Sequence, residues 1–270
     1  MKRVIVSMGL LALAYSCATN PFTGKQTMAL VPDSQIFPMS FQQYSQFLSE
    51  NKVVTGTKDA ARVEAVANKI KVAAERWLTA NGKADYLKDY KWEYKLVDSK
   101  EVNAWCMPGG KIVVYTGILP ITKDDAGLAA VLGHEVAHAL ANHGQQRMSA
   151  GLLQQAGAVG VAVATQNKST EAQQAWMQAY GVGSQVGGML PFSRAHETEA
   201  DQIGLLLMTI AGYAPENAVG VWERMSAMSG GKAPAEFLST HPSNQTRIDN
   251  IKSWIPNVKK EAAKFNPSVK

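Results

Sequence analysis

Residues 123–143 read KDDAGLAAVLGHEVAHALANH, and this pattern predicts one long helix. The start of the helix resembles a capping box, because Thr122 stands three residues before Asp125. Apolar residues lie on several faces of the helix: Leu128, Val131, Leu132, Val136 and Ala139. We therefore expect the helix to lie in the core, where an unpaired polar side chain is costly. The two histidines and the glutamate inside it then need a ligand or a partner.

The spacing of those polar residues is typical of a metal site. His134 and His138 are four residues apart, and Glu135 directly follows the first of them. Four residues advance a helix by about 6 Å and about 400°, so both imidazoles project from one face. Their nitrogens can then reach one Zn²⁺. The carboxylate of Glu135 can reach a zinc-bound water molecule, accept its proton and later deliver that proton to a leaving amine.

A catalytic zinc needs a third protein ligand and one open position. One class of zinc peptidases uses a histidine six residues after the second zinc histidine, but that position here is Gly144. His143 stands five residues after His138, which turns a helix by about 500°. We therefore expect His143 to point away from the two zinc histidines, either at the surface or behind the ligands.

A later helix, expected over 193–211, offers carboxylates instead. Glu197 and Asp201 are four residues apart and share a face, whereas Glu199 lies about 200° round from Glu197 and is expected to face elsewhere. Glu197 could bind zinc while Asp201 orients a ligand histidine. A solvated helix N-terminus also favours acidic residues, so this stretch alone leaves the choice open.

The remaining pattern predicts one α+β domain. Residues 18–35 are typical of an extended tether or a latching arm. Residues 151–190 are rich in Ala, Gly and Gln, and their most apolar piece, residues 151–165, is expected to be a core helix or a flexible hairpin rather than a membrane span. The expected regular elements are helices over 58–81, 216–229 and 244–254 and strands over 90–97 and 111–116.

Composition excludes several classes of protein. Of the 270 residues, 46% are apolar and 18% are charged, which excludes a disordered chain. The net charge of +5 is spread along the chain without a dense basic block, so no nucleic-acid partner is expected. Two cysteines exclude a disulfide-dense scaffold and a four-cysteine zinc site.

The N-terminus predicts an export signal. Basic residues Lys2 and Arg3 precede an apolar stretch over 4–15, which is shorter than the roughly 20 residues that span a membrane. The stretch ends at Ala14-Tyr15-Ser16-Cys17, which resembles a lipobox. We therefore expect Cys17 to become the lipidated first residue of the mature chain.

Four motifs in this order resemble the M48 family of zinc metalloendopeptidases, most closely its exported, outer-membrane-associated branch. The resemblance spans about residues 60–255 and implies a mostly helical, zincin-like (gluzincin) α+β domain with a small β-sheet before the zinc helix. It also implies one Zn²⁺ per chain, bound by His134, His138 and Glu197, with Asp201 behind a ligand. The motifs are Asn103 to Val114, His134-Glu135-x-x-His138, Glu197-x-x-x-Asp201 and Ser239-Thr240-His241-Pro242.

The resemblance implies roles for two further regions. The strand that carries Gly110, Ile112 and Val114 is expected to bind an extended substrate through main-chain hydrogen bonds at a sheet edge. His241 is expected near the metal, and two roles stay open for it. It either donates a hydrogen bond to the oxyanion of the reaction intermediate, or it occupies the fourth zinc position and keeps the enzyme latent.

Together these features predict a zinc-dependent endopeptidase that cleaves misfolded or misassembled cell-envelope proteins, with Glu135 activating the water. The alternative is a chaperone-like or latent lipoprotein that binds unfolded chains and cleaves rarely. The expected location is the bacterial envelope, on the periplasmic side of the outer membrane. The expected division is a signal peptide over 1–16, a lipid-anchored arm over 17–40, the peptidase domain over 41–256 and a Lys-rich tail over 257–270.

Overall fold

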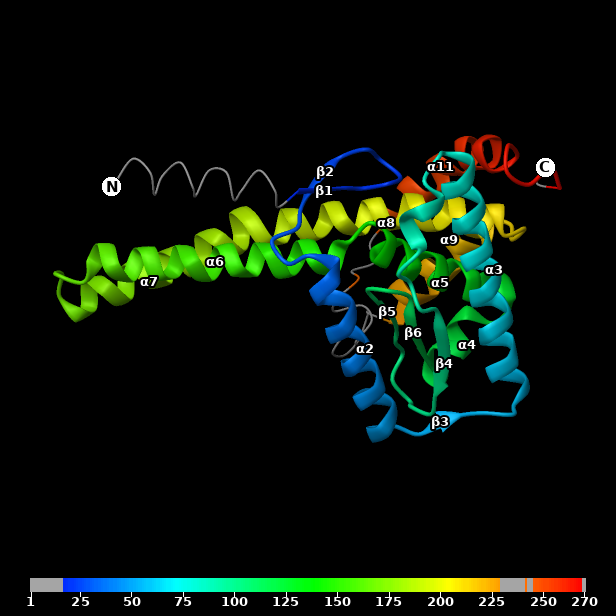
Figure 1. The fold of residues 1–270 in the computed structure, drawn as a ribbon, viewed down its shortest axis with the longest axis horizontal. Coiled ribbons are helices and arrows are strands. Elements are labelled where there is room, and N and C mark those ends of the chain that lie inside the picture. The colour runs from blue at the N-terminus through cyan, green and yellow to red at the C-terminus, as the bar shows by residue number, and fades with distance from the viewer. Residues whose placement is uncertain (1–16, 229–240, 242–244, 269–270) are drawn as a thin grey trace.

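The computed structural model describes residues 17–228, 241 and 245–268 (Figure 1). Its strands are β1 (Cys17–Thr19), β2 (Gln26–Met28), β3 (Val53–Val54), β4 (Glu93–Val97), β5 (Ala104–Met107) and β6 (Lys111–Tyr115). Its α-helices are α2 (Asp33–Glu50), α3 (Lys58–Ala80), α4 (Leu119–Thr122), α5 (Asp125–Leu140), α6 (His143–Thr165), α7 (Thr170–Ser184), α8 (Leu190–Ile210), α9 (Glu216–Met228) and α11 (Gln245–Ala262). The predicted class, a mostly helical α+β domain with a small sheet before the zinc helix, is confirmed.

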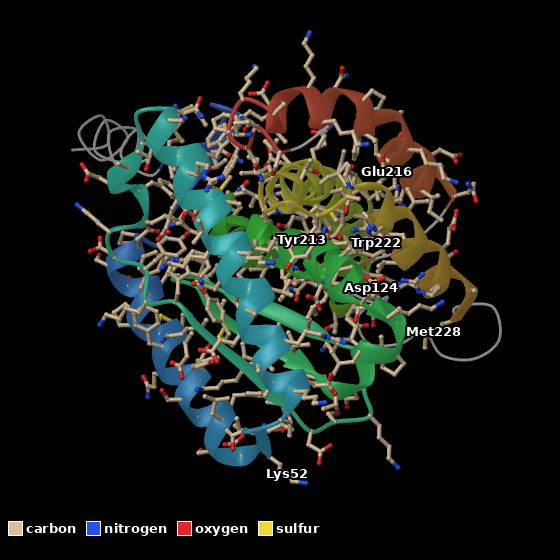
Figure 2. All side chains as sticks on the ribbon, turned by 90° about the vertical axis from the view of Figure 1, so that its right-hand side faces the viewer. Lys52, Asp124, Tyr213, Glu216, Trp222 and Met228 are labelled. Atoms are coloured by element: carbon tan, nitrogen blue, oxygen red, sulfur yellow. The ribbon has the colours of Figure 1, made fainter. Side chains whose placement is uncertain are left out.

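Helix α5 is the centre of the core. Every residue from Gly127 to Leu140 is buried, and α3, α8 and α9 pack around the helix (Figure 2). Its cap is Asp124, whose carboxylate accepts a hydrogen bond from the Gly127 amide at 2.8 Å. The helix is shorter at both ends than the predicted 123–143. Thr122 belongs to α4, and Asn142 leaves the helix with a left-handed φ of 57°.

The crossing of α5 and α8 is unusually close, because glycine faces glycine there. A Cβ atom on Gly204 would lie 2.7 Å from the backbone nitrogen of His134, and one on Gly133 would lie 2.7 Å from the carbonyl oxygen of Gly204. The atoms closest to these added Cβ atoms belong to the backbone, so a side chain at either position would require the two helices to move apart. The absence of side chains at these two positions therefore fixes how near α8 comes to the histidine-bearing turn of α5.

The main sheet has the strand order β3-β4-β6-β5. Strand β6 pairs in parallel with β4 on one side and antiparallel with β5 on the other. Ile112 and Val114 are fully buried in this central strand. The prediction that the strand after the double glycine is a sheet edge is therefore wrong. Gly109 and Gly110 both have positive φ and form a tight turn that folds β5 back over that side, so β5 is the edge.

Residues 151–165 are not a core helix: they form the mostly exposed second half of α6, which makes a helical hairpin with α7. Helices α6 and α7 and the first part of α8 project together from one side of the domain (Figure 1). No residue of α7 is buried, although the hydroxyl of Tyr180 donates to the carbonyl of Gln154 across the helix pair. Within the part of the chain that the structure describes, no helix is both long and apolar enough to cross a membrane.

Three segments toward the ends of the chain have more regular structure than the sequence analysis predicted. Helix α2 was not predicted, although Phe37, Phe41, Tyr44 and Leu48 recur at helical spacing. Tyr44 packs in a small cluster against Val113 and Tyr115 of β6. The hairpin β1–β2 packs near the start of α6, where the amide of Leu30 donates to the hydroxyl of Ser149 at 3.0 Å. Helix α11 runs to Ala262, past the expected end of the last helix.

We predict that Gly204→Ala lowers the free energy of unfolding by about 1–3 kcal/mol, because the new methyl group must push two backbones apart. The matched control is Gly160→Ala on the exposed face of α6, where an added Cβ atom would meet nothing within 4 Å. That variant should gain about 0.5–1 kcal/mol through the lower flexibility of its unfolded chain. Urea unfolding of both variants measures the difference, and equal effects would contradict a close crossing.

Candidate metal centre

Four buried side chains from separate parts of the chain meet beside α5. Each of His134, His138, Glu197 and His241 offers one ligand atom, and the four atoms lie within 4.8 Å of one another. Nε2 of His134 lies 3.1 Å from Nε2 of His138 and 3.1 Å from Nδ1 of His241. The Glu197 carboxylate lies 3.3 Å from Nε2 of each α5 histidine and 2.9 Å from Nδ1 of His241. The three predicted ligands are thus together, with His241 as a fourth.

The donor atoms suit a zinc ion. Imidazole nitrogens and a carboxylate oxygen are ligands that Zn²⁺ takes in proteins, and two histidines with one glutamate make a known catalytic set. The nearby Glu135 gives independent support. Its Oε1 is buried and has no hydrogen-bond partner among the described residues, and it lies 3.7 Å from Nε2 of His241. Burial also raises the pKa of this carboxyl group.

His134 is held from behind by an ionic group. Its Nδ1 lies 2.9 Å from Oδ1 of Asp201, which in turn accepts a hydrogen bond of 2.6 Å from Nη2 of Arg247. Nε of the same arginine donates to Oδ2 of Asp201 at 2.7 Å, and the guanidinium stacks on Trp222 at 3.5 Å. Burial alone would raise the pKa of Asp201, but Arg247 and His134 hold it below its usual range. Asp201 therefore stays charged and can keep a proton on Nδ1 of His134.

His138 is held from behind by His143, in one of the two positions that the sequence left open for His143. Its Nδ1 lies 2.8 Å from Nδ1 of His143, and Nε2 of His143 lies 2.9 Å from Oε2 of Glu199. A continuous helix would point His143 away, but the left-handed Asn142 starts α6 in a new direction and returns the ring beneath His138. An asparagine at the end of an apolar helix was the available signal. Glu199 does face away from Glu197, as predicted, and that side is where His143 lies.

The charges within the metal-free group are unevenly shared. Burial acts to lower the pKa of His134, but hydrogen bonds to Asp201 and Glu197 outweigh it and raise the pKa to about 9. Burial lowers the pKa of His138 well below its usual value. Burial disfavours ionised Glu197, yet hydrogen bonds with the three histidines hold its pKa far below the usual range. His134 therefore carries a proton at neutral pH, while His138 is neutral.

Comparison of the sequence with known proteins relates this chain to peptidases. The model of Peptidase family M48 matches residues 62–255. The mitochondrial metalloendopeptidase OMA1 of Schizosaccharomyces pombe is 41% identical over 182 residues, which cover 66% of this chain and 51% of the relative. Human metalloendopeptidase OMA1 is 29% identical over 266 residues, 94% of this chain and 49% of the relative. Metalloprotease YcaL of Escherichia coli is 28% identical over 168 residues, 62% of this chain and 63% of the relative.

The comparisons correct the predicted location. The chain spans about half the length of the two OMA1 relatives, and both are mitochondrial. The fission-yeast protein is 41% identical to this chain over the matched residues, whereas the bacterial YcaL is 28% identical. The predicted location, on the periplasmic side of a bacterial outer membrane, is therefore contradicted. Its physical basis was weak, because a short apolar stretch after basic residues does not say which membrane the chain reaches.

We predict that zinc binding by the metal-free protein releases about one proton near pH 7, because the protonated His134 must lose its proton to become a ligand. Since its pKa is about 9, the apparent zinc affinity should rise about tenfold per pH unit between about pH 6 and 8. Titration calorimetry in buffers of different ionisation enthalpy counts the released protons. Asp201→Asn removes one of the two carboxylates that raise this pKa, so the release should shrink, and an unchanged release would contradict the assignment.

Proposed function

Because this chain belongs to peptidase family M48, we propose that it is a zinc-dependent endopeptidase that hydrolyses unfolded or misassembled proteins. Family membership confirms the predicted class of enzyme and the prediction of zinc as the cofactor. The observation that carries the proposal is the buried group of His134, His138 and Glu197 beside the Glu135 carboxylate, whose buried Oε1 has no hydrogen bond within the described residues. The substrate class is part of the proposal. It is supported by the name of one relative, the beta-barrel assembly-enhancing protease of Yersinia pestis.

The protein side chains have separate tasks in this proposal. His134, His138 and Glu197 would hold the zinc ion, which when bound supplies a Lewis acid and lowers the pKa of water. Glu135 accepts a proton from the attacking water and passes it to the leaving amine. The raised pKa of Glu135 suits this exchange, because a general base works best when its pKa is near the working pH.

We place the substrate along strand β5 rather than β6. The amide of Tyr115 donates to the carbonyl of Asn103 at 3.1 Å, so that pair is hydrogen-bonded. Hydrogen-bonded and non-hydrogen-bonded residue pairs alternate in an antiparallel ladder, so Ala104 and Cys106 form non-hydrogen-bonded pairs with β6. Their main-chain N–H and C=O groups therefore point toward the open edge of the sheet. Cys106 also lines a cavity of about 60 Å³ together with His138. Main-chain pairing at this edge would give loose sequence preference, which suits unfolded substrates.

A latent state is the second candidate, and the position of His241 favours it. Nδ1 of His241 stands among the ligand atoms, 3.1 Å from Nε2 of His134. A fourth protein ligand closes the position that a catalytic zinc keeps open. We therefore propose that His241 blocks the metal until a substrate or partner displaces it, which also accounts for a form that binds chains and cleaves rarely.

Membrane attachment through a lipid on Cys17 also belongs to this proposal. Cys17 is exposed at the start of β1, so its thiol is accessible to a modifying enzyme. The predicted boundaries of the arm, the peptidase domain and the tail stay predictions.

We predict that Glu135→Gln abolishes cleavage of an unfolded protein substrate, with a rate loss of at least about 10²-fold, because the amide cannot accept the proton. Wild-type cleavage should also stop when zinc is chelated and return when zinc is added. The control is Glu223→Gln, which changes an exposed glutamate paired with Lys252 and should cleave at the wild-type rate. Cleavage that survives in Glu135→Gln would mean that another group is the base.

We predict that His241→Ala raises the cleavage rate severalfold, because it frees the fourth position while three ligands remain. Peptide-release kinetics with a zinc-content assay on the same sample measure both effects. A rate that falls while the zinc content stays at one per chain would contradict the block. That result would instead favour a hydrogen bond from His241 to the charge that develops on the substrate.

A further inference from the structure

We propose that His143 and Glu199 form a positioning pair for the ligand His138, and that Asn20 of the hairpin β1–β2 completes this pair. The inference deepens the proposed function and rests on zinc binding at His134, His138 and Glu197. Its consequence is that residues outside the stretch matched by the family, 62–255, help to build the metal centre.

The contacts form one continuous line of polar groups that are buried or, at Glu199, partly buried. From His138 the line runs through His143 to Glu199, with separations of 2.8 Å and 2.9 Å. The same Oε2 of Glu199 accepts a hydrogen bond of 2.9 Å from Nδ2 of Asn20. Asn20 and His143 are both 0% exposed, so water cannot replace these partners at their positions. The ring of His143 also stacks on His196 at 4.1 Å, which fixes its plane.

The line determines which nitrogen of His138 carries hydrogen. The Glu199 carboxylate can only accept, so Nε2 of His143 donates to it. Two Nδ1 atoms 2.8 Å apart cannot both carry hydrogen, so Nδ1 of a neutral His143 accepts from Nδ1 of His138. Nε2 of His138 then has a free lone pair, and that atom is the one in the ligand group. This arrangement is the tautomer that a zinc ligand needs.

The two zinc histidines are therefore supported by carboxylates in unequal ways. Asp201 contacts His134 directly, whereas Glu199 reaches His138 only through His143. Both carboxylates come from α8, on different faces. The support of His138 contains one more hydrogen bond than that of His134, so it also depends on the position of the His143 ring.

The hairpin is built to hold Asn20 in place. Oδ1 of Asn20 accepts hydrogen bonds from the amides of Phe22 at 2.9 Å and Thr23 at 3.3 Å, so the turn fixes the direction of Nδ2. The ring of Phe22 stacks on Trp77 of α3 with centroids 4.3 Å apart. The hairpin is thus a latch whose buried polar tip reaches Glu199, in line with the latching arm expected of this segment.

The test measures zinc affinity and the visible spectrum of the Co²⁺-substituted protein, with the full chain and a competing chelator. His143→Leu removes both the acceptor for His138 and the donor to Glu199, and we expect zinc affinity to fall about 10–100-fold. His143→Gln keeps an acceptor and a donor at a similar separation and should stay within about threefold of the wild type. The Co²⁺ bands should shift in the leucine variant and not in the glutamine variant.

A second pair of variants tests the latch by changing the charge of the hairpin at one buried and one exposed position. Asn20→Asp keeps the oxygen that closes the turn but places a carboxylate against Glu199, and we expect several-fold weaker zinc binding. Gln26→Glu makes the same change of charge at an exposed position of the same hairpin and should bind zinc as the wild type does. Thermal unfolding of the metal-free proteins shows whether each variant is folded.

The outcomes separate this inference from the proposed function. If the wild type binds no zinc, the proposed function fails and the inference fails with it. If folded His143→Leu binds zinc as tightly as the wild type, with unchanged Co²⁺ bands, only the positioning pair is overturned. Should His143→Leu not fold, Asn20→Asp decides, and equal zinc affinity in Asn20→Asp and Gln26→Glu overturns the role of the latch.

Discussion

The close crossing of α5 and α8 is the contact on which the rest of the structure depends. Gly133 and Gly204 bring two backbones together, so the carboxylates of α8 reach the histidines of α5 inside the core. A wider crossing would leave Glu197 and Asp201 too far away to contact His134. The metal group is thus a consequence of helix packing, and one contact between two small residues controls both stability and chemistry.

Burying so many ionisable groups is costly unless each has a partner. Ion pairs offset this cost in the structure: Asp201 pairs with Arg247, Glu199 with His143, and Glu197 with the three histidines of the metal group. One buried acidic oxygen in the described residues, on Glu135, is left without a hydrogen bond. This oxygen lies beside the metal group, where a water molecule would be activated. A buried carboxylate without a hydrogen bond is suited to accept a proton there. The polar network and the proposed reaction therefore follow from the same arrangement.

The sequence predicted the parts of this arrangement that depend on helical periodicity. The apolar faces of α3 and α5 and the spacing of His134, Glu135 and His138 follow from regular geometry, and the structure places them accordingly. The family resemblance was needed to choose Glu197, because a helix N-terminus explains acidic residues equally well.

The failures occurred where geometry is set by the tertiary structure. The direction of His143 depends on a single left-handed residue, Asn142, and the edge of the sheet depends on a turn at Gly109 and Gly110. Neither the break in the helix nor the strand order can be read from apolar spacing. Helix α2 is a different case, since Phe37, Phe41, Tyr44 and Leu48 recur at helical spacing and apolar periodicity indicates it. Pro38 near its start, a residue typical of a helix break, is the feature that argues against this helix.

Anomalous diffraction at the zinc absorption edge, from crystals of the zinc-loaded protein, tests the central claim most directly. The account predicts one peak per chain, about 2.0–2.1 Å from Nε2 of His134 and from Nε2 of His138, with the Glu197 carboxylate as the third ligand. A peak elsewhere, or zinc-loaded crystals without a peak between these three side chains, would contradict it.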